Sequence, residues 1–508
     1  MQSFYRLAAG LLSALMLLGA AAGCAAKPDD APATTDAASG APVSVDTEPP
    51  QTEAAPSGRA AYRDNLPDDL DFDGAAAHLY YRDSLERHSV YGTDNVGDIV
   101  TDAIWDRNVK VQERLHVEFD YIRSISSAIA DVVAAIRQAA AAGLNEWDVI
   151  LTTNNSTVTQ GMDNLMLDLR ALPYLDLEQP YWWQNAMENV SLTGAERRYL
   201  IGDFMLLNYY RTGAFYYNKN LYESLYGDAE EPYGYVLDGS WTYDRMLERA
   251  QGAYKDANGN GKTDVEDTVG YVIASTFEEQ MCQVAEAFAI TTYSRAEDGS
   301  VVLDMGNEHI FDVSQRLYHM ASQPCALISG SKISEAGAVF TEGRVLFFPG
   351  RFDIITSSAF REMTDDYGVL PYPKYDENQK EYVTLCHNSS ACACVLTTLE
   401  TDRYALIGAV LEALGAESYR SVTDIFLDTA LKFKYSRDAA SGQVIDIILA
   451  GIHKDLVHEF PSYTSDIFNV LTKNAPAKEG AYISAYKKLG TAAQANLNKA
   501  IKVIRAGN

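Results

Sequence analysis

The sequence predicts an α/β protein with a parallel, doubly wound sheet, and three observations lead to this fold class. Strand and helix patterns alternate from residue 76 to residue 152, which favours parallel pairing with right-handed crossovers. The later chain continues to mix the two kinds of element. Apolar residues make up 47% of the chain, and roughly 440 residues follow position 66, a length that implies more than one domain or lobe.

Apolar periodicity assigns the first elements. Apolar side chains at helical spacing predict helices over 100–115 and 129–136, and Gly143 stands where a left-handed C-cap is expected. Alternating or continuous apolar runs predict strands over 76–81, 117–121 and 147–152. In such sheets ligands bind beyond the C-terminal ends of the strands. The residues at these ends are Arg82, Asp83, Thr153 and Asn154.

The later elements follow the same rules. Short apolar runs predict strands over 215–217, 270–273 and 345–348, and periodicity predicts a helix over 243–254. A last helix carries its apolar face on Leu497, Ala500, Ile501 and Ile504.

The N-terminus predicts export and a lipid anchor. A basic Arg6 precedes an apolar run over 7–22, which is too short for a spanning helix and is typical of a signal peptide. The ending Ala-Ala-Gly-Cys resembles the bacterial lipobox, in which cleavage occurs before a lipidated cysteine. We therefore expect a signal peptide over 1–23, a lipid on Cys24 and a protein held at the extracellular face of the membrane. The alternative is ordinary secretory cleavage with a spare cysteine.

A linker is predicted between this anchor and the folded body. Residues 24–66 are rich in Ala, Pro, Thr, Ser and Asp, so they cannot bury enough apolar surface to offset the entropy of ordering. We expect a disordered stalk over this range.

Charge and cysteine content exclude several functions. The net charge of −29 argues against nucleic acid or an anionic membrane surface as a partner, because both are polyanions. The 32 tyrosines suit wet surfaces such as sugar or peptide sites, or ordinary packing. Cys386, Cys392 and Cys394 lie close together without zinc-site spacing, so we expect them to be buried apolar residues.

One segment has the spacing of a calcium loop. Oxygen-bearing side chains fall at positions 1, 3, 5, 9 and 12, Gly261 occupies the turn position, and position 7 offers a backbone carbonyl. The predicted ligands of a structural Ca²⁺ are Asp256, Asn258, Asn260, Lys262, Asp264 and Asp267. Asp267 stands where Glu is usual, and its shorter side chain weakens bidentate binding of the ion. The alternative is an Asn- and Gly-rich turn without an ion.

Searches for catalytic motifs find nothing. The chain has no GxSxG nucleophile elbow, no HExxH helix and no phosphate-binding loop. With 70 carboxylates, a glycosidase-like acid pair can be imagined anywhere, so none is evidence. We expect no enzymatic activity and no catalytic cofactor.

Seven segments, in their order, resemble the family 1 extracellular solute-binding proteins of bacterial ABC importers. The similarity extends from about residue 78 to the C-terminus. The segments are DAIWDRNVKVQERLHVEFDY, WDVILTTNNS, LMLDLRALPYLDLEQPYWW, GAFYYNKNLYESLYG, GSWTYDRMLERAQGAYKDANGNGKTDVEDTVGY, FTEGRVLFFPGR and YGVLPYPKYDENQ.

This resemblance implies a two-lobed, type II periplasmic-binding-protein-like fold with an interlobe cleft. The first α/β lobe would comprise 70–212 plus 395–455, and the second 213–394 plus 456–508. The resemblance also implies that hinge closure on a solute, commonly a carbohydrate, delivers it to ABC permease subunits in the membrane. A monomeric body is expected.

Aromatic and planar polar side chains are the groups that a sugar site requires. The candidate ligand-binding residues are Asp83, Asn154, Trp182, Trp183, Asp203, Tyr209, Tyr210, Trp241, Phe348 and Arg351. Each has a plainer alternative: Trp241 can pack on a helix turn, one of the paired tryptophans can face the core, and Arg351 can form an ion pair.

Three other functions stay open at this point. The chain can instead bind a peptide or another polar solute, in which case charge rather than aromatic rings would line the cleft. It can be a secreted hydrolase, which a carboxylate pair at the cleft would favour. It can also be a sensor that reports its ligand to a partner.

Overall fold

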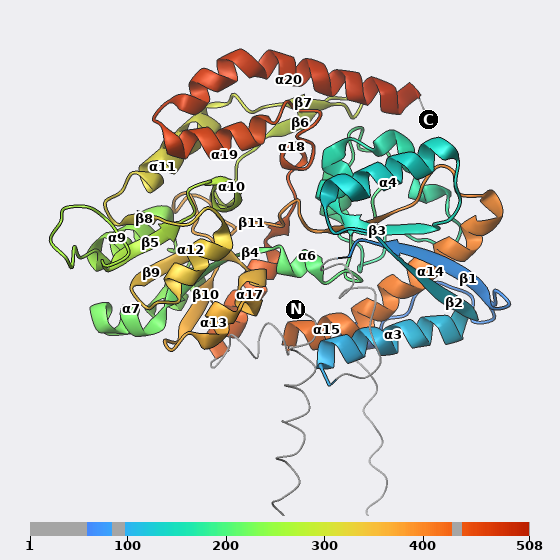
Figure 1. Cartoon of the computed structure of the whole chain (residues 1–508), viewed down its shortest axis with the longest axis horizontal. Helices are drawn as coiled ribbons and strands as arrows, with labels where there is room; N and C mark the ends of the chain where they lie inside the picture. Colours follow the sequence, from blue (N-terminus) through green and yellow to red (C-terminus); the bar gives the residue numbers. More distant parts are fainter. Residues whose placement is uncertain (1–57, 84–96, 429–438, 507–508) are drawn as a thin grey trace, which may run out of the picture. The chain divides into compact units, whose positions relative to one another are not determined.

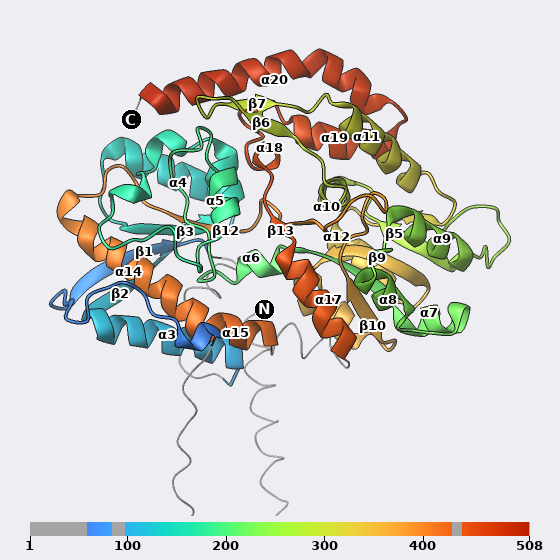
Figure 2. The same cartoon turned by 180° about the vertical axis from the view of Figure 1, so that it is seen from behind.

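The computed structural model describes residues 58–83, 97–428 and 439–506, which belong to one compact unit. Two separate β-sheets each carry their own helices (Figures 1 and 2), so the body consists of two α/β lobes. The predicted fold class is therefore confirmed. Cys24 and the predicted signal peptide lie outside the described residues.

The first sheet has the strand order β12-β3-β1-β2. β1 pairs in parallel with β2 and β3, with Leu79 opposite Tyr121 and Val149, whereas β12 runs antiparallel to β3. Its strands are β1 (Ala75–Tyr81), β2 (Val117–Arg123), β3 (Val149–Thr153) and β12 (Ala391–Cys394). The three strands predicted at the start of the chain are all present.

Helices predicted from periodicity cover this sheet. α3 begins after Asp98, whose side chain accepts from the Thr101 N–H, and α4 ends at Gly143, whose φ of 65° is the predicted left-handed cap. The helices of this part are α3 (Ile99–Leu115), α4 (Ile129–Ala142), α5 (Gln184–Asn189), α6 (Leu207–Tyr210), α14 (Tyr404–Glu417) and α15 (Thr423–Ile425).

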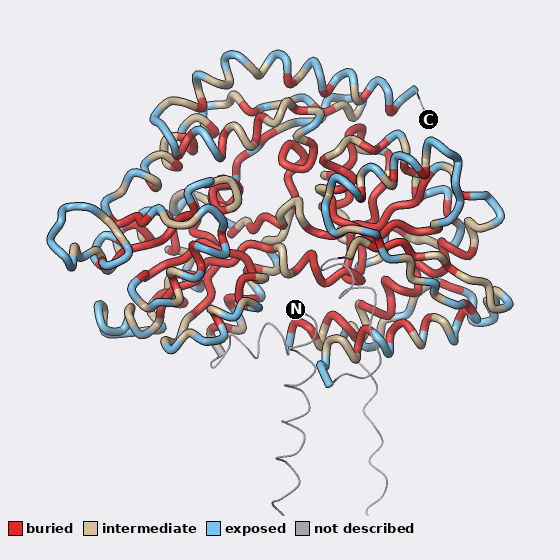
Figure 3. Tube along the Cα trace, viewed as in Figure 1, coloured by how far each residue is buried: buried red, intermediate tan, exposed pale blue. Residues whose placement is uncertain are grey.

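The second sheet has the order β10-β4-β9-β5-β8. β5, β8 and β9 are parallel, whereas β4 runs antiparallel to β9 and β10. All five strands are largely buried, as Figure 3 shows. Their bounds are β4 (Gly213–Asn218), β5 (Val269–Ile273), β8 (Ala326–Ile328), β9 (Val345–Arg351) and β10 (Tyr367–Leu370).

The remaining helices belong mostly to the second lobe. The long α20 packs on α19 and α11 (Figure 2). Its buried residues include Leu497, Ile501 and Ile504, three of the four predicted for its apolar face. The bounds are α7 (Lys219–Tyr226), α8 (Glu231–Leu237), α9 (Tyr243–Ala253), α10 (Glu278–Ala287), α11 (Glu308–Ala321), α12 (Ile333–Phe340), α13 (Ser358–Glu362), α17 (Ala439–Ala450), α18 (Leu456–Glu459), α19 (Ile467–Ala477) and α20 (Ala481–Ala506).

Three segments meet at the junction between the two sheets. The first leads from α6 into β4, the second contains β11 (Thr384–Leu385), and the third contains β13 (Ile452–His453). β11 pairs in parallel with β13, and Thr212 forms a bridge with Cys386. A separate hairpin joins β6 (Tyr293–Arg295) to β7 (Val301–Leu303).

The lobe boundaries differ from the predicted ones at two places. β12, at 391–394, joins the first sheet four residues before the predicted boundary, because it pairs with β3. α17, at 439–450, packs against β10 and α8 of the second lobe, although it falls within the range assigned to the first. Both differences depend on contacts between residues far apart in the chain, and local sequence patterns do not predict such contacts.

The predicted stalk is also too long at its C-terminal end. Residues 58–66 pack on the first lobe: the Tyr62 ring lies edge-on to Tyr181 and Tyr419, and Arg114 binds Asp64 with both terminal nitrogens. Leu66 is buried. These few anchoring side chains order a segment whose composition alone predicts disorder.

Among the helices at 58–83, 97–428 and 439–506, none combines the length and the apolar character that crossing a bilayer requires.

Candidate functional site

The carboxyl ends of the parallel strands place polar residues beside the junction. In the first sheet, β3 ends directly before Asn154. In the second, β9 ends at Arg351, opposite the start of β4 at Gly213, and α10 begins at Glu278 shortly after β5. These are the edges at which α/β sheets bind their ligands.

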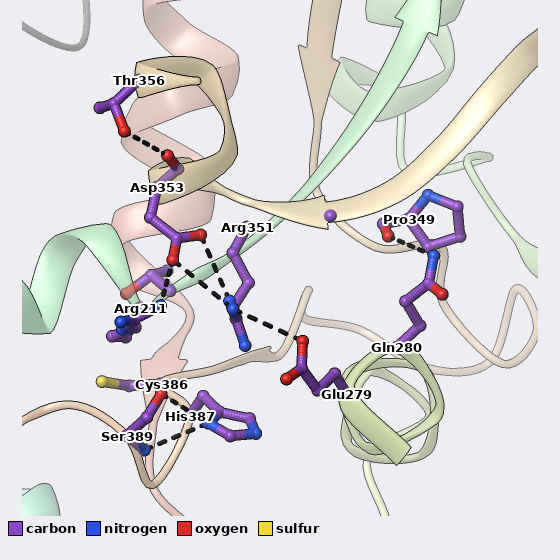
Figure 4. A network of polar contacts seen from close by, with 12 residues as sticks. Arg211, Glu279, Gln280, Pro349, Arg351, Asp353, Thr356, Cys386, His387 and Ser389 are labelled. Carbon is purple, nitrogen blue, oxygen red and sulfur yellow. Dashed lines mark hydrogen bonds and ion pairs between the residues drawn. The ribbon is translucent and has the colours of Figure 1, made fainter. Parts of the chain in front are cut away.

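Arg351 forms the centre of a buried ionic network, drawn in Figure 4. Its Nε lies 3.3 Å from Asp353 Oδ1 and its Nη2 lies 3.7 Å from Glu279 Oε2, and Asp353 also pairs with Arg211. Burial lowers the pKa of Arg351, but the carboxylates of Asp353 and Glu279 outweigh this and raise it above its ordinary value. The guanidinium is therefore charged and held in a fixed orientation.

The described residues line a cavity of about 620 Å³ and another of about 310 Å³, which share no lining residue. The smaller one borders the Arg351 network. Its lining includes three cationic residues, two acidic residues and three hydroxyl residues: Arg211, Lys332, Arg351, Glu279, Asp353, Ser334, Thr356 and Ser357. It contains no aromatic ring.

Asn154 belongs to a second buried network at the junction. Its Nδ2 donates to Glu459 Oε2 at 2.9 Å, and the other oxygen of that carboxylate lies 2.8 Å from Lys454 Nζ. Lys454 also donates to Ser390 Oγ at 2.6 Å. Burial lowers the pKa of Lys454, but the nearby Cys386 and Glu459 raise it above its ordinary value.

Several buried polar atoms at this junction have no hydrogen-bond partner among the described residues. They include Asn154 Oδ1 and both amide atoms of Gln283. Buried polar groups in folded proteins are nearly always paired, because an unpaired one costs about 1–3 kcal/mol. A polar solute with several hydroxyl groups supplies the donors and acceptors that these atoms lack.

Three predicted residues gather at the larger cavity instead. Trp183 Nε1 and the Tyr209 hydroxyl each donate to Asp203 Oδ1 at 2.8 Å, and Arg59 Nη1 lies 3.4 Å from Asp203 Oδ2. Burial raises the pKa of Asp203, while Trp183 and Arg59 act against that rise. Tyr419 and residues of α17 complete the lining.

The Arg351–Asn154 region is the better candidate site. The Asp203 carboxylate already has three internal partners, so it has little capacity left for a solute. By contrast, the strand-end region holds the unpartnered atoms and lies at the sheet edges where α/β folds bind ligands.

Three aromatic predictions need correction. Trp182, Trp241 and Phe348 are at most 2% exposed and lie in the hydrophobic core. Trp241 Nε1 donates to the Pro371 carbonyl oxygen, and Phe348 stacks between Tyr216 and Phe340. Each of these rings lies on the side of its segment that faces the interior of its lobe. The order of residues in the sequence does not show which side that is.

The other two predicted residues lie apart from both networks. Asp83 follows β1 and pairs with Arg123 at the end of β2. Tyr210 is half-buried against the Phe426 ring, and burial raises its pKa to about 12. Its neighbour Arg211 is the residue of α6's end that reaches the smaller cavity.

The sequence analysis missed Arg211, Glu279, Lys454 and Glu459. Each is one of many charged residues, and only the packing of α10, α18 and the junction segments brings them to the strand ends. Only the position of Glu279 could have indicated its role, because it lies in the first turn of a helix that follows a strand, where α/β sheets bind ligands.

The predicted calcium loop folds as a series of tight turns. Asp256 accepts from the N–H groups of Gly259 and Gly261 at 2.7 and 2.9 Å, and Asp267 accepts from Ala257 and Asp264. The amide nitrogens of Asn258 and Asn260 both donate to Asp264. The donor set of oxygens fits Ca²⁺, provided that these amides turn their oxygens inward.

Comparison with protein-family models and with curated proteins gives no match. Solved structures do match. A cyclo/maltodextrin-binding protein complexed with maltotetraose gives a TM-score of 0.50 at 12% identity, over 85% of this chain and 97% of that one. The maltose/maltodextrin-binding domain from Bdellovibrio bacteriovorus, bound to maltotriose, gives 0.48 at 11% identity over 84% and 100%. An ABC substrate-binding protein from Listeria monocytogenes, in complex with cycloalternan, gives 0.48 at 13% over 85% and 100%.

The first of these likenesses identifies the fold. This chain shares the two-lobed architecture of a sugar-binding protein over nearly the whole of that protein's length. Its described residues therefore adopt the fold that the sequence resemblance implied.

Proposed function

We propose that this chain is an extracellular solute-binding protein that captures a carbohydrate, such as an oligosaccharide, between its lobes and delivers it to an ABC permease. The observation that carries the proposal is the gathering of unpartnered buried polar atoms at the strand ends of both lobes. The maltotetraose complex of the structural neighbour supports a sugar as the solute. The charged lining of the smaller cavity, which contains no aromatic ring, favours a peptide or another polar solute as the second candidate.

The remaining parts of the proposal follow from the sequence. Lipidation of Cys24 would hold the body at the extracellular face of the membrane, and the body would act as a monomer. The neighbour is a binding protein, which supports binding without catalysis. Ca²⁺ in the loop at 256–267 would serve as a structural ion.

A thermal-shift screen of the full chain tests this function. Maltotetraose, mannotriose, monosaccharides and short peptides are added in turn, with calcium present. A ligand at 100 times its dissociation constant adds about 2.7 kcal/mol of stability. We expect the melting temperature to rise with sugars only. A rise with peptides only would mean that the ligand is a peptide. Release of products from a bound sugar would mean that the chain is a hydrolase.

Two matched variants locate the site. Glu279→Gln removes a carboxylate at the smaller cavity, so we expect it to weaken sugar binding about tenfold or more, or about 1.4 kcal/mol. Asp203→Asn makes the same chemical change at the larger cavity, and we expect affinity to stay within about a factor of two. The reverse result would move the site to the Trp183–Asp203–Tyr209 group.

A further inference from the structure

Three metal-ligating side chains meet at the junction between the lobes. Cys282 lies on α10, His387 lies between β11 and β12, and His458 lies on α18. One ligand atom of each lies within 4.8 Å of the other two, and within the described part of the chain no other three His, Cys, Asp or Glu residues converge so closely. The His387 and His458 rings are 5.2 Å apart and nearly perpendicular.

The polar atoms of this trio are poorly satisfied by the protein itself. His458 is 3% exposed, and its Nδ1 has no hydrogen-bond partner among the described residues. Cys282 is fully buried, and its Sγ lies 3.2 Å from the Glu279 carbonyl oxygen of its own helix. A buried imidazole nitrogen without a hydrogen-bond partner destabilises the folded protein unless something binds to it.

The surroundings orient the ligands. His387 Nδ1 lies 2.9 Å from Ser389 Oγ, a contact drawn in Figure 4, and its backbone N–H donates to the Arg211 carbonyl oxygen at 3.0 Å. The Ser389 backbone N–H also approaches His387 Nδ1, at 3.1 Å. Zinc at Nε2 therefore requires the ring proton to lie on Nδ1 and to be donated to Ser389 Oγ, because a metal-bound histidine donates its other ring N–H to a neighbouring acceptor.

We propose that Cys282, His387 and His458 form a Zn²⁺ site with one open coordination position. A thiolate and two imidazoles are ligands that zinc prefers, and three protein ligands plus an open position form the pattern that accepts water or a solute atom. Zn–S and Zn–N bonds of about 2.3 and 2.0 Å place ligand atoms about 3.5 Å apart in a tetrahedron. Because the three ligand atoms lie within 4.8 Å of one another, the trio needs a contraction of at most about 1.3 Å.

The local charge permits a dication there. The cations nearby are Arg211, Arg351 and Lys454, and each is paired with a carboxylate, from Asp353, Glu279 and Glu459. The Cys282 thiolate then offsets part of the zinc charge. The ligands come from α10, from the segment after β11 and from α18, so bound zinc would hold these three elements together. This inference does not depend on the solute being a sugar.

Cobalt substitution tests the site on the full chain, purified without a polyhistidine tag. Co²⁺ is titrated into the metal-free protein, and Zn²⁺ is then added in competition. We expect one equivalent of tetrahedral Co²⁺ with sulfur-to-cobalt charge-transfer absorption, displaced by one equivalent of Zn²⁺. We also expect zinc to raise the melting temperature.

Matched cysteine variants make the test specific. Cys282→Ser should abolish the charge-transfer band, and His458→Ala should weaken Co²⁺ binding at least tenfold. Cys325→Ser, which alters another buried cysteine of the second lobe, should leave both unchanged. If the wild-type chain gives no sulfur-to-cobalt band, or if the band persists in Cys282→Ser, the site does not exist. The wild-type titration decides the matter even if a variant fails to fold.

Discussion

Lys454 and Glu459 form an ion pair with 2.8 Å between Nζ and Oε1, and neither side chain is exposed to solvent. The other Glu459 oxygen accepts from Asn154, 305 residues earlier in the chain, and Lys454 also donates to Ser390. The pair thus fixes the third junction segment to the carboxyl edge of the first sheet. Its hydrogen bonds compensate for the desolvation of both charges.

Breaking this pair should destabilise the protein strongly. Lys454→Met leaves the Glu459 carboxylate buried without its counter-ion, and the expected loss is about 3–5 kcal/mol of unfolding free energy. The double variant Lys454→Met with Glu459→Gln removes both charges and should recover much of that loss. Urea unfolding measures both.

A surface pair provides the control. Arg245→Met breaks the contact between Arg245 and Glu248 on α9, and both of these side chains are substantially exposed. We expect little change there, because exposed ion pairs contribute little. Equal losses for the buried and exposed pairs would contradict the role assigned to Lys454.

Two helix glycines should respond in opposite directions to alanine. A Cβ at Gly408 of α14 would collide with the Pro173 carbonyl oxygen, whereas one at Gly442 of α17 would meet no atom within 4 Å. Gly408→Ala should therefore cost about 1–3 kcal/mol. Gly442→Ala should add up to about 1 kcal/mol, the ordinary gain in helix propensity. Equal responses in urea unfolding would show that α14 does not approach Pro173 this closely.

Removal of calcium should destabilise the loop at 256–267. Ca²⁺ added back to the metal-free wild-type chain is expected to raise the melting temperature, because an ion bound in the loop would stabilise the folded state by mass action. Asp256→Asn should remove that response, since position 1 supplies a carboxylate ligand. Magnesium at the same concentration should not produce it. A melting temperature that does not change with Ca²⁺ would leave the loop as a simple Asn- and Gly-rich turn.

The sequence predicted the elements well because periodicity is local. Strands and helices of the first lobe follow from side-chain spacing within one segment, and Asn154 was found because it follows a predicted strand. Arg351 was proposed for its planar polar group, and the observed β9 extends three residues beyond the predicted strand to reach it. Trp182 and Trp241 were predicted to line the ligand site but lie in the core, because a residue's type does not show which face of its element is buried.

The rest of the site could not be predicted, because it depends on pairs far apart in the chain. Glu459 reaches Asn154 only after the chain has passed between the lobes, and the Arg351 partner Glu279 lies 72 residues away from it on another element. The spacing of charged residues in a chain with 70 carboxylates gives no signal for such pairs.

Asp163 should make stability depend on pH. It is 1% exposed, accepts from the Tyr463 hydroxyl at 3.0 Å, and burial raises its pKa to about 7. In the unfolded chain its pKa lies near 4. Between these two values the unfolded state ionises while the folded state keeps its proton, so rising pH favours unfolding. The contribution is fully present below about pH 4 and is lost as pH rises to about 7.

Asp163→Asn provides the measurement, because an amide has the same shape and does not ionise. Relative to the wild type, the variant's unfolding free energy should improve by up to about 1.4 kcal/mol for each pH unit between 4 and 7, and then level off. Urea unfolding at several pH values in this window gives the slope. Tyr463→Phe, which removes the hydroxyl that lowers the Asp163 pKa, should extend the wild-type dependence to higher pH without changing its maximum slope. A difference between Asp163→Asn and the wild type that stays constant from pH 4 to pH 8 would mean that Asp163 is ionised in the folded protein.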